Sequence, residues 1–340
     1  MGHPAHFHLL KNTIAYLEKK GHQCIITSKK KDILDMLLTN AGFNYINILK
    51  EGRKNNRISI LIGVFKRSYR LYKLLKKEKV DMLIGTSVEN PIIGSLLKIP
   101  AVNLNEDDAD VVPLYAKLSY PFSSTILTPV SCDNGRWNKK SIKYESYHEL
   151  AYLHPNNFNP KKNIVDSYIK EKRPYFLIRF ADLGAHHDSG IAGINTKIAQ
   201  NIIDILRPYG YIYITSERPL EKELENLRIN INPIDIHHVL AFAKLFIGDS
   251  QTMAAEAAVL GTPFIRINDF AGRIGYLREL EERYHLGYSS SPENKEYIIM
   301  QLQKLLELPN LEEIFNNRKD KMLVEKLDFT QYLTNFIENY

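Results

Sequence analysis

Cysteine is nearly absent from this sequence, and long hydrophobic runs are missing as well. Only Cys24 and Cys132 occur in 340 residues, so the sequence offers neither a disulfide framework nor the spacing of a zinc site. The longest apolar run, 58–65, is too short to span a bilayer. No G-x-G-x-x-G or G-x-x-x-x-G-K-[S/T] motif occurs, which argues against dinucleotide oxidoreductases and P-loop NTPases. We therefore expect a globular protein of a reducing compartment, with the cytoplasm as its location.

The charge is distributed unevenly along a chain that is long enough for two domains. Residues 1–140 hold 22 Lys and Arg against 12 Asp and Glu, whereas residues 141–340 hold 23 against 27. Such asymmetry indicates that the two halves face different partners. A basic first half suits nucleic acid, anionic lipid or a phosphorylated acceptor.

The stretch 244–268 predicts a βαβ unit. A short apolar run at 245–248 predicts a buried strand, a helix follows over 253–260, and 264–267 predicts the next strand. The side chains of Asp249, Ser250 and Thr252 are suited to cap the start of this helix, and Gly261 marks its end. The polar loop then lies at the carboxyl end of the first strand, where open α/β sheets bind ligands.

The start of this helix suggests a phosphate site. Free N–H groups and the positive end of the helix dipole favour an anion, so Ser250 and Thr252 are placed to hold a diphosphate. Glu256 is the only charge on an otherwise apolar helix, and its carboxylate could accept two ribose hydroxyls. A second interpretation stays open, in which the helix is only tightly packed and Glu256 is solvated or paired.

The pattern D-S-x5-E-A-x2-L-G-x-P, which begins at Asp249, resembles the donor-site motif of GT-B glycosyltransferases and of the related non-hydrolysing UDP-sugar 2-epimerases. Up to residue 300, the chain resembles an uncharacterised prokaryotic GT-B-like family linked to cell-surface polysaccharide synthesis. The resemblance implies two doubly wound Rossmann-like domains that face a cleft. It also implies a nucleoside-diphosphate sugar, expected to be UDP-linked, and neither a metal nor another cofactor. The donor would be bound through Ser250, Gln251, Thr252 and Glu256.

The alternation of apolar strands and helices on both sides of residue 150 predicts the same α/β organisation. We expect an acceptor-side domain over 1–140 and a nucleotide-sugar-binding domain over 141–310. Helices over 311–340 should pack back across both domains. The first helix is expected only from Leu9, and no strand precedes it, so we expect that a first central strand of roughly eight residues is missing and encoded upstream.

Loops after other predicted strands supply further donor-site candidates. The Arg179 guanidinium could neutralise a departing diphosphate, although pairing with a core carboxylate is an equal alternative. His187 lies in the polar loop that follows, and Ser216 and Arg218 follow the next strand. Ile236 lies where the resemblance implies that the nucleotide base stacks.

The first domain supplies candidates for a general base. His3 and His6 lie in an opening loop, G-H-P-A-H-F-H, that resembles the N-domain loop of GT-B enzymes, and imidazole titrates near working pH. A structural or solvated role stays open, whereas their spacing does not favour a metal site. Glu89 and Glu106 follow two successive strands in an arrangement similar to the acceptor side of lipid-linked N-acetylglucosaminyltransferases. The tripeptide Asp108-Ala-Asp110 matches the metal-binding DxD of GT-A enzymes, but it is too short to weigh against the GT-B pattern.

Two further segments stand out. The sequence predicts a long helix over 57–79 with an apolar stripe and a basic face, which is either a core stripe with a solvated back or a peripheral contact with the inner face of the plasma membrane. The segment Tyr147-His-Glu-Leu150 is characteristic of the resembling family, but the resemblance implies no role for it. We expect the last strand of the first domain over 123–127 and an interdomain passage over 129–163.

We expect a metal-independent glycosyltransferase that transfers a sugar from a nucleoside-diphosphate donor to a glycan or lipid-linked acceptor in cell-surface polysaccharide or glycolipid synthesis. A non-hydrolysing UDP-sugar 2-epimerase is the first alternative, although the opening loop lacks the Arg-Pro-Glu of that family. A non-catalytic sugar-nucleotide-binding protein is the second. No nucleic-acid partner is expected, because the basic helix lacks a recognised motif.

Overall fold

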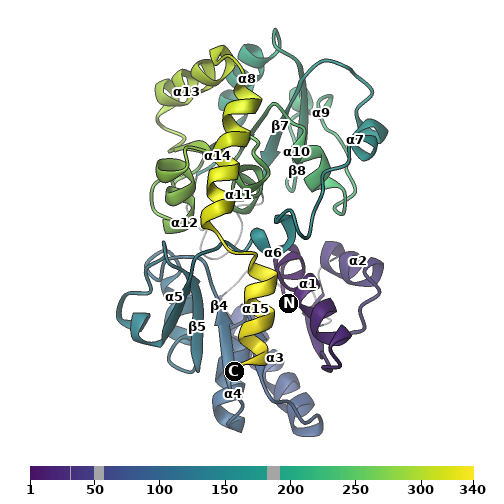
Figure 1. Cartoon of the computed structure of the whole chain (residues 1–340), viewed down its shortest axis with the longest axis vertical. Helices are drawn as coiled ribbons and strands as arrows, with labels where there is room; N and C mark the ends of the chain where they lie inside the picture. The colour runs from purple at the N-terminus through teal and green to yellow at the C-terminus, as the bar shows by residue number, and fades with distance from the viewer. Residues whose placement is uncertain (31, 50–56, 182–191) are drawn as a thin grey trace. The chain divides into compact units, whose positions relative to one another are not determined.

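The computed structural model describes residues 1–30, 32–49, 57–181 and 192–340. The chain forms two compact units, drawn in Figure 1. Unit 1 comprises Met1–Tyr152 together with Asp328–Tyr340, and unit 2 comprises Leu153–Leu327. The sequence places a boundary at residue 140, whereas the contacts keep the chain in unit 1 up to Tyr152.

Unit 1 alternates strands and helices. Its described strands are β1 (Ile26–Lys29), β2 (Tyr45–Leu49), β3 (Leu83–Gly85), β4 (Ala101–Leu104), β5 (Thr125–Pro129) and β6 (Ser141–Tyr144). Its described helices are α1 (Pro4–Lys19), α2 (Asp32–Asn40), α3 (Arg57–Lys77), α4 (Glu89–Leu97), α5 (Pro113–Ser119), the 3₁₀ helix η1 (Gly135–Lys140) and α15 (Phe329–Glu338). Helix α6 (Leu150–Leu153) runs into unit 2 at its last residue.

The strands of unit 1 form two parallel sheets. β3, β4, β5 and β6 pair in that order, and β1 pairs with β2. Beside β1, the backbone N–H of Lys29 donates to the carbonyl of Met1 at 3.1 Å. The prediction that the last strand of this domain lies at 123–127 is wrong, because β6 follows within the expected interdomain passage and pairs with β5. Two of its four residues are exposed, so this strand has no apolar run that could have revealed it.

The opening residues form a helix, which corrects the prediction of a loop. α1 begins at Pro4, five residues before the predicted start. The Nδ1 atom of His3 accepts the N–H of Ala5 at 3.2 Å, so His3 caps the helix. Proline suits the first helical position, because its fixed φ is helical and the missing N–H has no partner there. His3 and Pro4 therefore start the helix, although residues of these types are also common in loops.

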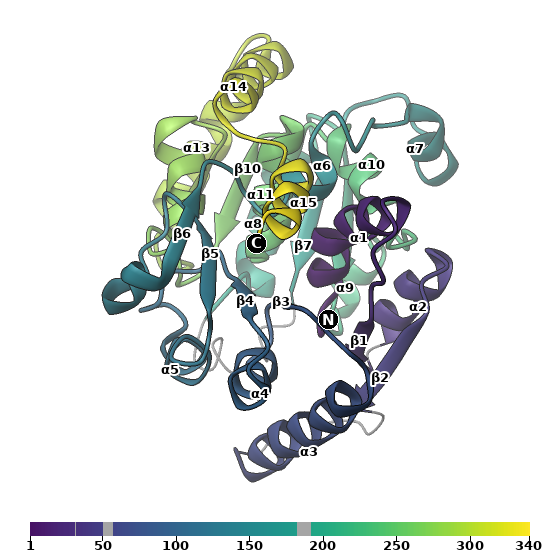
Figure 2. The same cartoon turned by 60° about the horizontal axis from the view of Figure 1, so that its bottom comes forward.

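The last helix of the chain completes the core of unit 1. α15 lies beside α1 in Figures 1 and 2. Phe329 is fully buried, with its ring centroid 4.6 Å from that of Tyr144. The Thr330 hydroxyl donates to the carbonyl of Ala151 at 2.6 Å. Burial of one phenylalanine side chain contributes about 2–3 kcal/mol, so residues 328–340 are an integral part of this unit.

Unit 2 is a second α/β unit. Its described strands are β7 (Tyr175–Phe180), β8 (Tyr211–Ser216), β9 (Leu245–Gly248), β10 (Phe264–Ile267) and β11 (Gly287–Ser290). Its described helices are α7 (Lys162–Tyr168), α8 (Thr196–Leu206), α9 (Lys222–Glu225), α10 (Ile236–Ala241), α11 (Gln251–Leu260), α12 (Gly275–Arg278), the π-helix η3 (Glu279–Arg283), α13 (Lys295–Glu307) and α14 (Leu311–Glu325).

All five described strands of unit 2 are parallel, in the order β8-β7-β9-β10-β11. This is the 2-1-3-4-5 order of a doubly wound sheet, in which the strand order reverses between β7 and β9. The predicted strands β9 and β10 are confirmed with the predicted bounds, and α11 begins two residues earlier than predicted. Gly261 ends α11 at φ 83°, a conformation that favours glycine.

Candidate functional site

The start of α11 directly follows β9, at the point where the strand order of the sheet reverses between β7 and β9. Ser250 is the N-cap of α11, and its Oγ accepts the N–H of Met253 at 3.3 Å. Among the described residues, no acceptor is hydrogen-bonded to the backbone N–H of Gln251 or Thr252. Both residues are half-buried, so solvent reaches this helix end. Two unpaired N–H groups and the helix dipole make it suited to an anion.

Asp249 organises the loops around this helix start. Its side chain is buried, and it accepts the N–H groups of Ala181 (2.6 Å) and Ile194 (3.3 Å) and the guanidinium of Arg218 (3.1 Å). Its carbonyl accepts the amide of Asn268 at 2.9 Å. Burial raises the pKa of the Asp249 carboxyl, and the donors oppose that rise. The sequence suggested only a capping role for Asp249, whereas its side chain joins the loops that follow β7 and β8, and its backbone carbonyl holds the residue that follows β10.

Glu256 is held by a histidine that the sequence did not single out. The Nε2 atom of His237, on α10, lies 2.9 Å from Oε1 of Glu256, and the two residues are only 3% and 5% exposed. The ring of Phe158 meets that of His237 edge-on at 6.1 Å. Glu256 therefore has a protein partner in this structure, and its contact with ribose stays a prediction. The pair of adjacent histidines near the start of α10 could have marked a functional segment, but the sequence does not show that one of them contacts α11.

The other donor-site candidates lie on the same edge of the sheet. The guanidinium of Arg179, on β7, donates to Glu217, which is an exposed carboxylate and not a core one. The Ser216 hydroxyl closes a turn with the backbone of Arg218, which donates to it at 3.2 Å and accepts from it at 2.6 Å. Ile236 is the first residue of α10 and is half-buried. His187 lies outside the described residues.

In unit 1, His6 lies among polar groups at the end of β3. Its imidazole nitrogens lie 2.8 and 2.9 Å from Oγ1 of Thr86, and Nδ1 accepts the N–H of Gly2 at 3.2 Å. Burial lowers the pKa of His6 well below its usual value, and the charges of Lys29 and the amino terminus act in the same direction. His6 is therefore neutral near pH 7. His3, in contrast, is exposed and caps α1.

Glu89 is part of a buried ion pair. Its carboxylate accepts from the guanidinium of Arg67 on α3, and both residues are buried. Burial raises the pKa of Glu89, but the charges of Lys29 and Arg67 and two hydrogen bonds outweigh it and leave the pKa lowered. A carboxylate that is stabilised as an anion and paired on its own unit is a weak proton acceptor.

Glu106 is paired with His148, from the Tyr147-His-Glu-Leu150 segment. Oε2 of Glu106 lies 3.3 Å from Nδ1 of His148 and accepts its backbone N–H at 3.2 Å. Burial lowers the pKa of His148 to about 3. His148 is thus a neutral imidazole whose Nδ1–H faces the carboxylate. Sequence reasoning missed this partner because the two residues are 42 positions apart.

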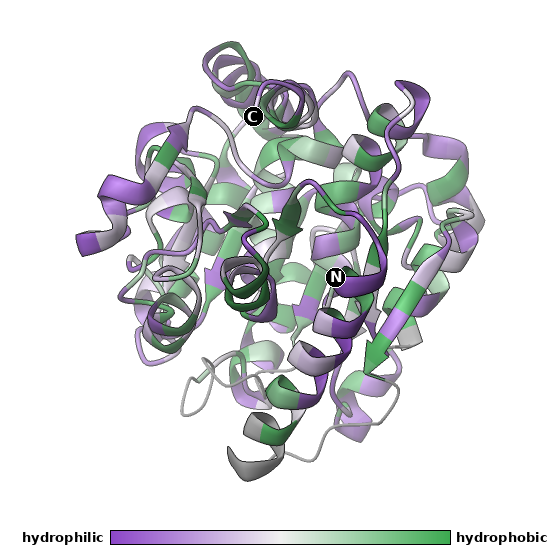
Figure 3. Ribbon diagram, turned by 90° about the horizontal axis from the view of Figure 1, so that it is seen from below, coloured by the Kyte–Doolittle hydropathy of each residue, from purple (hydrophilic) through white to green (hydrophobic). Residues whose placement is uncertain are grey.

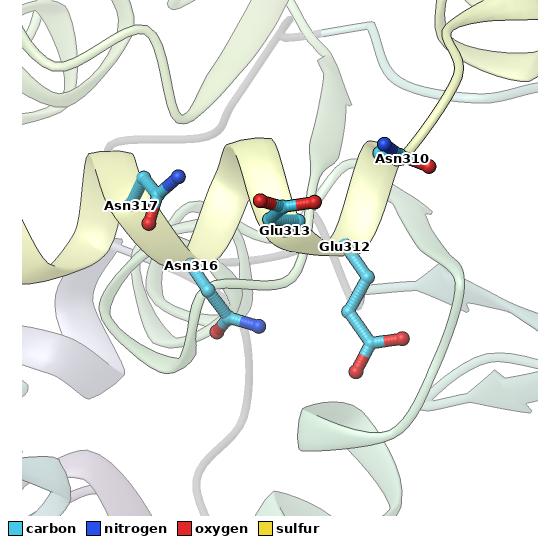
Figure 4. A pocket seen from close by; sticks show the side chains of 5 residues that line it. All are labelled: Asn310, Glu312, Glu313, Asn316 and Asn317. Carbon is cyan, nitrogen blue, oxygen red and sulfur yellow. The ribbon is translucent and has the colours of Figure 1, made fainter.

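A shallow pocket on α14 lies apart from these residues. It is lined by Asn310, Glu312, Glu313, Asn316 and Asn317, which project from the single helix drawn in Figure 4. None of the predicted site residues is among them. The candidate site is therefore defined by strand ends and by the start of α11, and this pocket is no part of it.

The fold is that of the GT-B glycosyltransferases and the UDP-GlcNAc 2-epimerases. The co-structure of S. aureus MnaA with UDP has a TM-score of 0.71 at 13% identity, over 100% of this chain and 95% of that one. UDP-GlcNAc 2-epimerase from Neisseria meningitidis bound to UDP-GlcNAc gives 0.67 at 15% identity, over 92% of each chain. The Streptomyces sp. SF2575 glycosyltransferase SsfS6, complexed with thymidine diphosphate, gives 0.60 at 11% identity, over 100% and 98%. Identities this low establish the fold alone.

The chain belongs to the family described as "Protein of unknown function (DUF354)", whose model matches residues 1–274. No curated protein matches the sequence. The predicted relation to a GT-B-like family of unassigned function is confirmed, because both the family and the fold neighbours agree with it.

Proposed function

We propose that unit 2 binds a nucleoside-diphosphate sugar, with UDP as the expected nucleotide. The observation that carries this proposal is the start of α11, where the N–H groups of Gln251 and Thr252 have no acceptor among the described residues. They lie at the switch point of a doubly wound sheet, where such sheets bind nucleotides. The diphosphate would accept from these N–H groups. Three of the fold neighbours carry UDP, UDP-GlcNAc or thymidine diphosphate, which supports the ligand class.

The remaining donor contacts follow from the same edge of unit 2. Glu256, positioned by His237, would receive the ribose hydroxyls, and Ile236 would contact the base. Arg179 and Arg218 would supply positive charge to the diphosphate leaving group, which replaces a metal ion in this proposal. Arg218 is already oriented by Asp249, so its contribution needs little reorganisation.

We further propose that the chain is a glycosyltransferase, in which unit 1 supplies the general base for an acceptor hydroxyl of a glycan or lipid-linked glycan. Of the four candidates, His6 and Glu106 fit this role best. His6 is neutral near pH 7 and has ring nitrogens that can accept a proton, although burial lowers its pKa and makes it a weaker base than a free imidazole. Glu106 is a carboxylate oriented by His148. Glu89 is held by Arg67, and His3 is engaged as a helix cap.

Transfer is tested by incubating the full chain with a panel of radiolabelled UDP-sugars and cell-envelope lipid. The proposal predicts release of UDP together with a labelled lipid product. Glu106→Gln and His6→Asn should lower turnover by about 10²-fold or more while UDP binding is kept. Binding without turnover in the wild type and in both variants would contradict transfer and indicate a non-catalytic binding protein.

A UDP-sugar 2-epimerase is the second candidate, and one observation favours it. The epimerase of Neisseria meningitidis has a higher TM-score than the glycosyltransferase SsfS6, 0.67 against 0.60. Epimerisation needs no acceptor, so proton NMR of UDP-GlcNAc incubated with the chain alone separates the two activities. Appearance of the 2-epimer would establish the epimerase, and an unchanged spectrum would leave transfer as the proposal.

A further inference from the structure

Helix α3 of unit 1 exposes an apolar stripe. Ile62, Phe65 and Tyr69 are 51%, 76% and 53% exposed. Their i, i+3 and i+7 spacing places them on one face of the helix. The opposite face holds the helix in place, since Leu71 and Leu75 are buried against the core. The stripe is therefore directed away from the core of unit 1 by the packing of the other face.

The stripe is accompanied by positive charge only. α3 contains no Asp or Glu, whereas Lys73 and Lys76 are exposed along the same helix. The Lys73 ammonium lies 4.8 Å from the centre of the Tyr69 ring. In Figure 3, α3 is the long helix in the foreground, and green and purple residues alternate along it.

Two neighbouring helices extend this exposed apolar surface. α4 packs against both α3 and α5, and the three helices lie in a row in Figure 2. Leu96 on α4 and Leu114 and Leu118 on α5 are exposed, and Lys117 lies between the two leucines of α5. Exposed apolar side chains thus recur on three adjacent helices of one unit, and exposed apolar residues that gather in one region mark interaction sites more often than scattered ones.

We propose that the α3–α5 layer of unit 1 binds the surface of an anionic lipid bilayer. Phe65, Ile62 and Tyr69 would enter the boundary between headgroups and acyl chains, and Lys73 and Lys76 would contact lipid phosphates. This is the pattern of an interfacial amphipathic helix, in which apolar residues and lysines act together. Contact would be peripheral, since none of the described helices is long and apolar enough to cross a membrane.

The charge pattern favours a bilayer over other occupants. A second copy of the chain would bring like-charged α3 helices together, which is repulsive. A nucleic acid would use the lysines and leave Ile62 and Phe65 without a partner, because phosphate contacts carry that binding. An anionic bilayer satisfies both kinds of side chain. Binding to a bilayer is a property separate from the proposed function, and it does not depend on nucleotide binding.

The test is cosedimentation of the full chain with vesicles of phosphatidylcholine alone or with about one third phosphatidylglycerol. We expect binding to the anionic vesicles and at least tenfold less to the neutral ones. Lys73→Gln with Lys76→Gln should weaken binding about 25-fold, since each lysine near an anionic surface strengthens it about fivefold. Phe65→Ser with Tyr69→Ser should weaken it at least tenfold even when both lysines are kept.

Val324→Ser is the matched control, because Val324 is an apolar residue of unit 2 that is 88% exposed. It should bind vesicles as the wild type does. Equal sedimentation of all variants, or no binding to anionic vesicles, would overturn the proposal. A dimer in analytical ultracentrifugation that Phe65→Ser abolishes would identify a second copy as the occupant instead. RNA binding that depends on the lysines but not on Phe65 would identify a nucleic acid.

Discussion

The neutral state of His148 makes a quantitative prediction about stability and pH. Its pKa is lowered by burial from 6.5 to about 3. The unfolded chain therefore takes up a proton near pH 6.5, and the folded chain does not until about pH 3. The contribution of this pKa difference to the free energy of unfolding is fully present above pH 6.5 and is lost as the pH falls from 6.5 toward 3. The slope approaches about 1.4 kcal/mol per pH unit, so about 2–3 kcal/mol is lost between pH 6.5 and 4.5.

His148→Asn tests this reasoning, because the Asn amide keeps an N–H donor for Glu106 and does not titrate. The variant loses the imidazole ring, whose centroid lies 5.5 Å from that of the Phe329 ring. This loss should lower the free energy of unfolding by about 1–3 kcal/mol at every pH. The free energy of unfolding of the variant should depend less steeply on pH than that of the wild type, with a slope that is smaller by up to about 1.4 kcal/mol per pH unit. Trp137, the only tryptophan of the chain, lies in unit 1, so urea unfolding followed by its fluorescence reports on this unit.

His285→Asn serves as the control for this experiment. His285 is an exposed residue of unit 2 with φ 52°, a conformation that asparagine tolerates. It should leave the pH dependence of the Trp137 transition unchanged. Equal slopes for wild type and His148→Asn between pH 4.5 and 6.5 would refute the reasoning, since they would mean that unit 1 accommodates a charged His148 beside Glu106.

Three further predictions concern the packing and the buried charges. Asp249→Asn should cost unit 2 about 3 kcal/mol in urea unfolding and weaken nucleotide binding, because an amide cannot accept all three donors that the carboxylate accepts; unchanged stability would contradict its role. Gly287→Ala should lower the free energy of unfolding by about 1–3 kcal/mol, since a Cβ would lie 2.3 Å from the buried Phe264 ring; a neutral effect would show that the ring relaxes. Arg67→Met should cost about 3–5 kcal/mol, and adding Glu89→Gln should restore part of it, because the first change leaves a buried carboxylate unpaired; no rescue by the second change would argue against the ion pair.

The sequence predicted the central βαβ unit well because its signals are local. Ser250 as cap, an alanine-rich helix and Gly261 as stop each depend on neighbouring residues only. The edge strand β6 and the start of α1 were missed, since the first lacks an apolar run and the second begins with residues that also suit a loop. Local propensity gave no signal for β6, and at α1 the proline fits the first position of a helix but suits a loop equally well.

Partners of the candidate residues could not be predicted, because the fold alone brings them together. His237 and Glu256 lie 19 positions apart on two helices, and His148 meets Glu106 across 42 positions. A sequence shows that such residues are titratable, but their burial and pairing depend on packing. Asp249 illustrates the same limit, since its polar character suggested a cap whereas in the structure its carboxylate accepts three donors from two loops.

The central claim is that a diphosphate binds the start of α11, and isothermal titration of UDP into wild type and Gln251→Glu tests it most directly. Glu at the first helical position complements the helix dipole, so the substitution should leave stability unchanged or slightly higher. It also places a negative charge beside the proposed phosphates, so UDP affinity should fall at least tenfold. Lys295→Glu also places a glutamate at the first position of a helix, α13, and changes the charge by two units instead of one, yet it should bind UDP as the wild type does. No UDP binding by the wild type, or equal affinity in the wild type and Gln251→Glu, would contradict the claim.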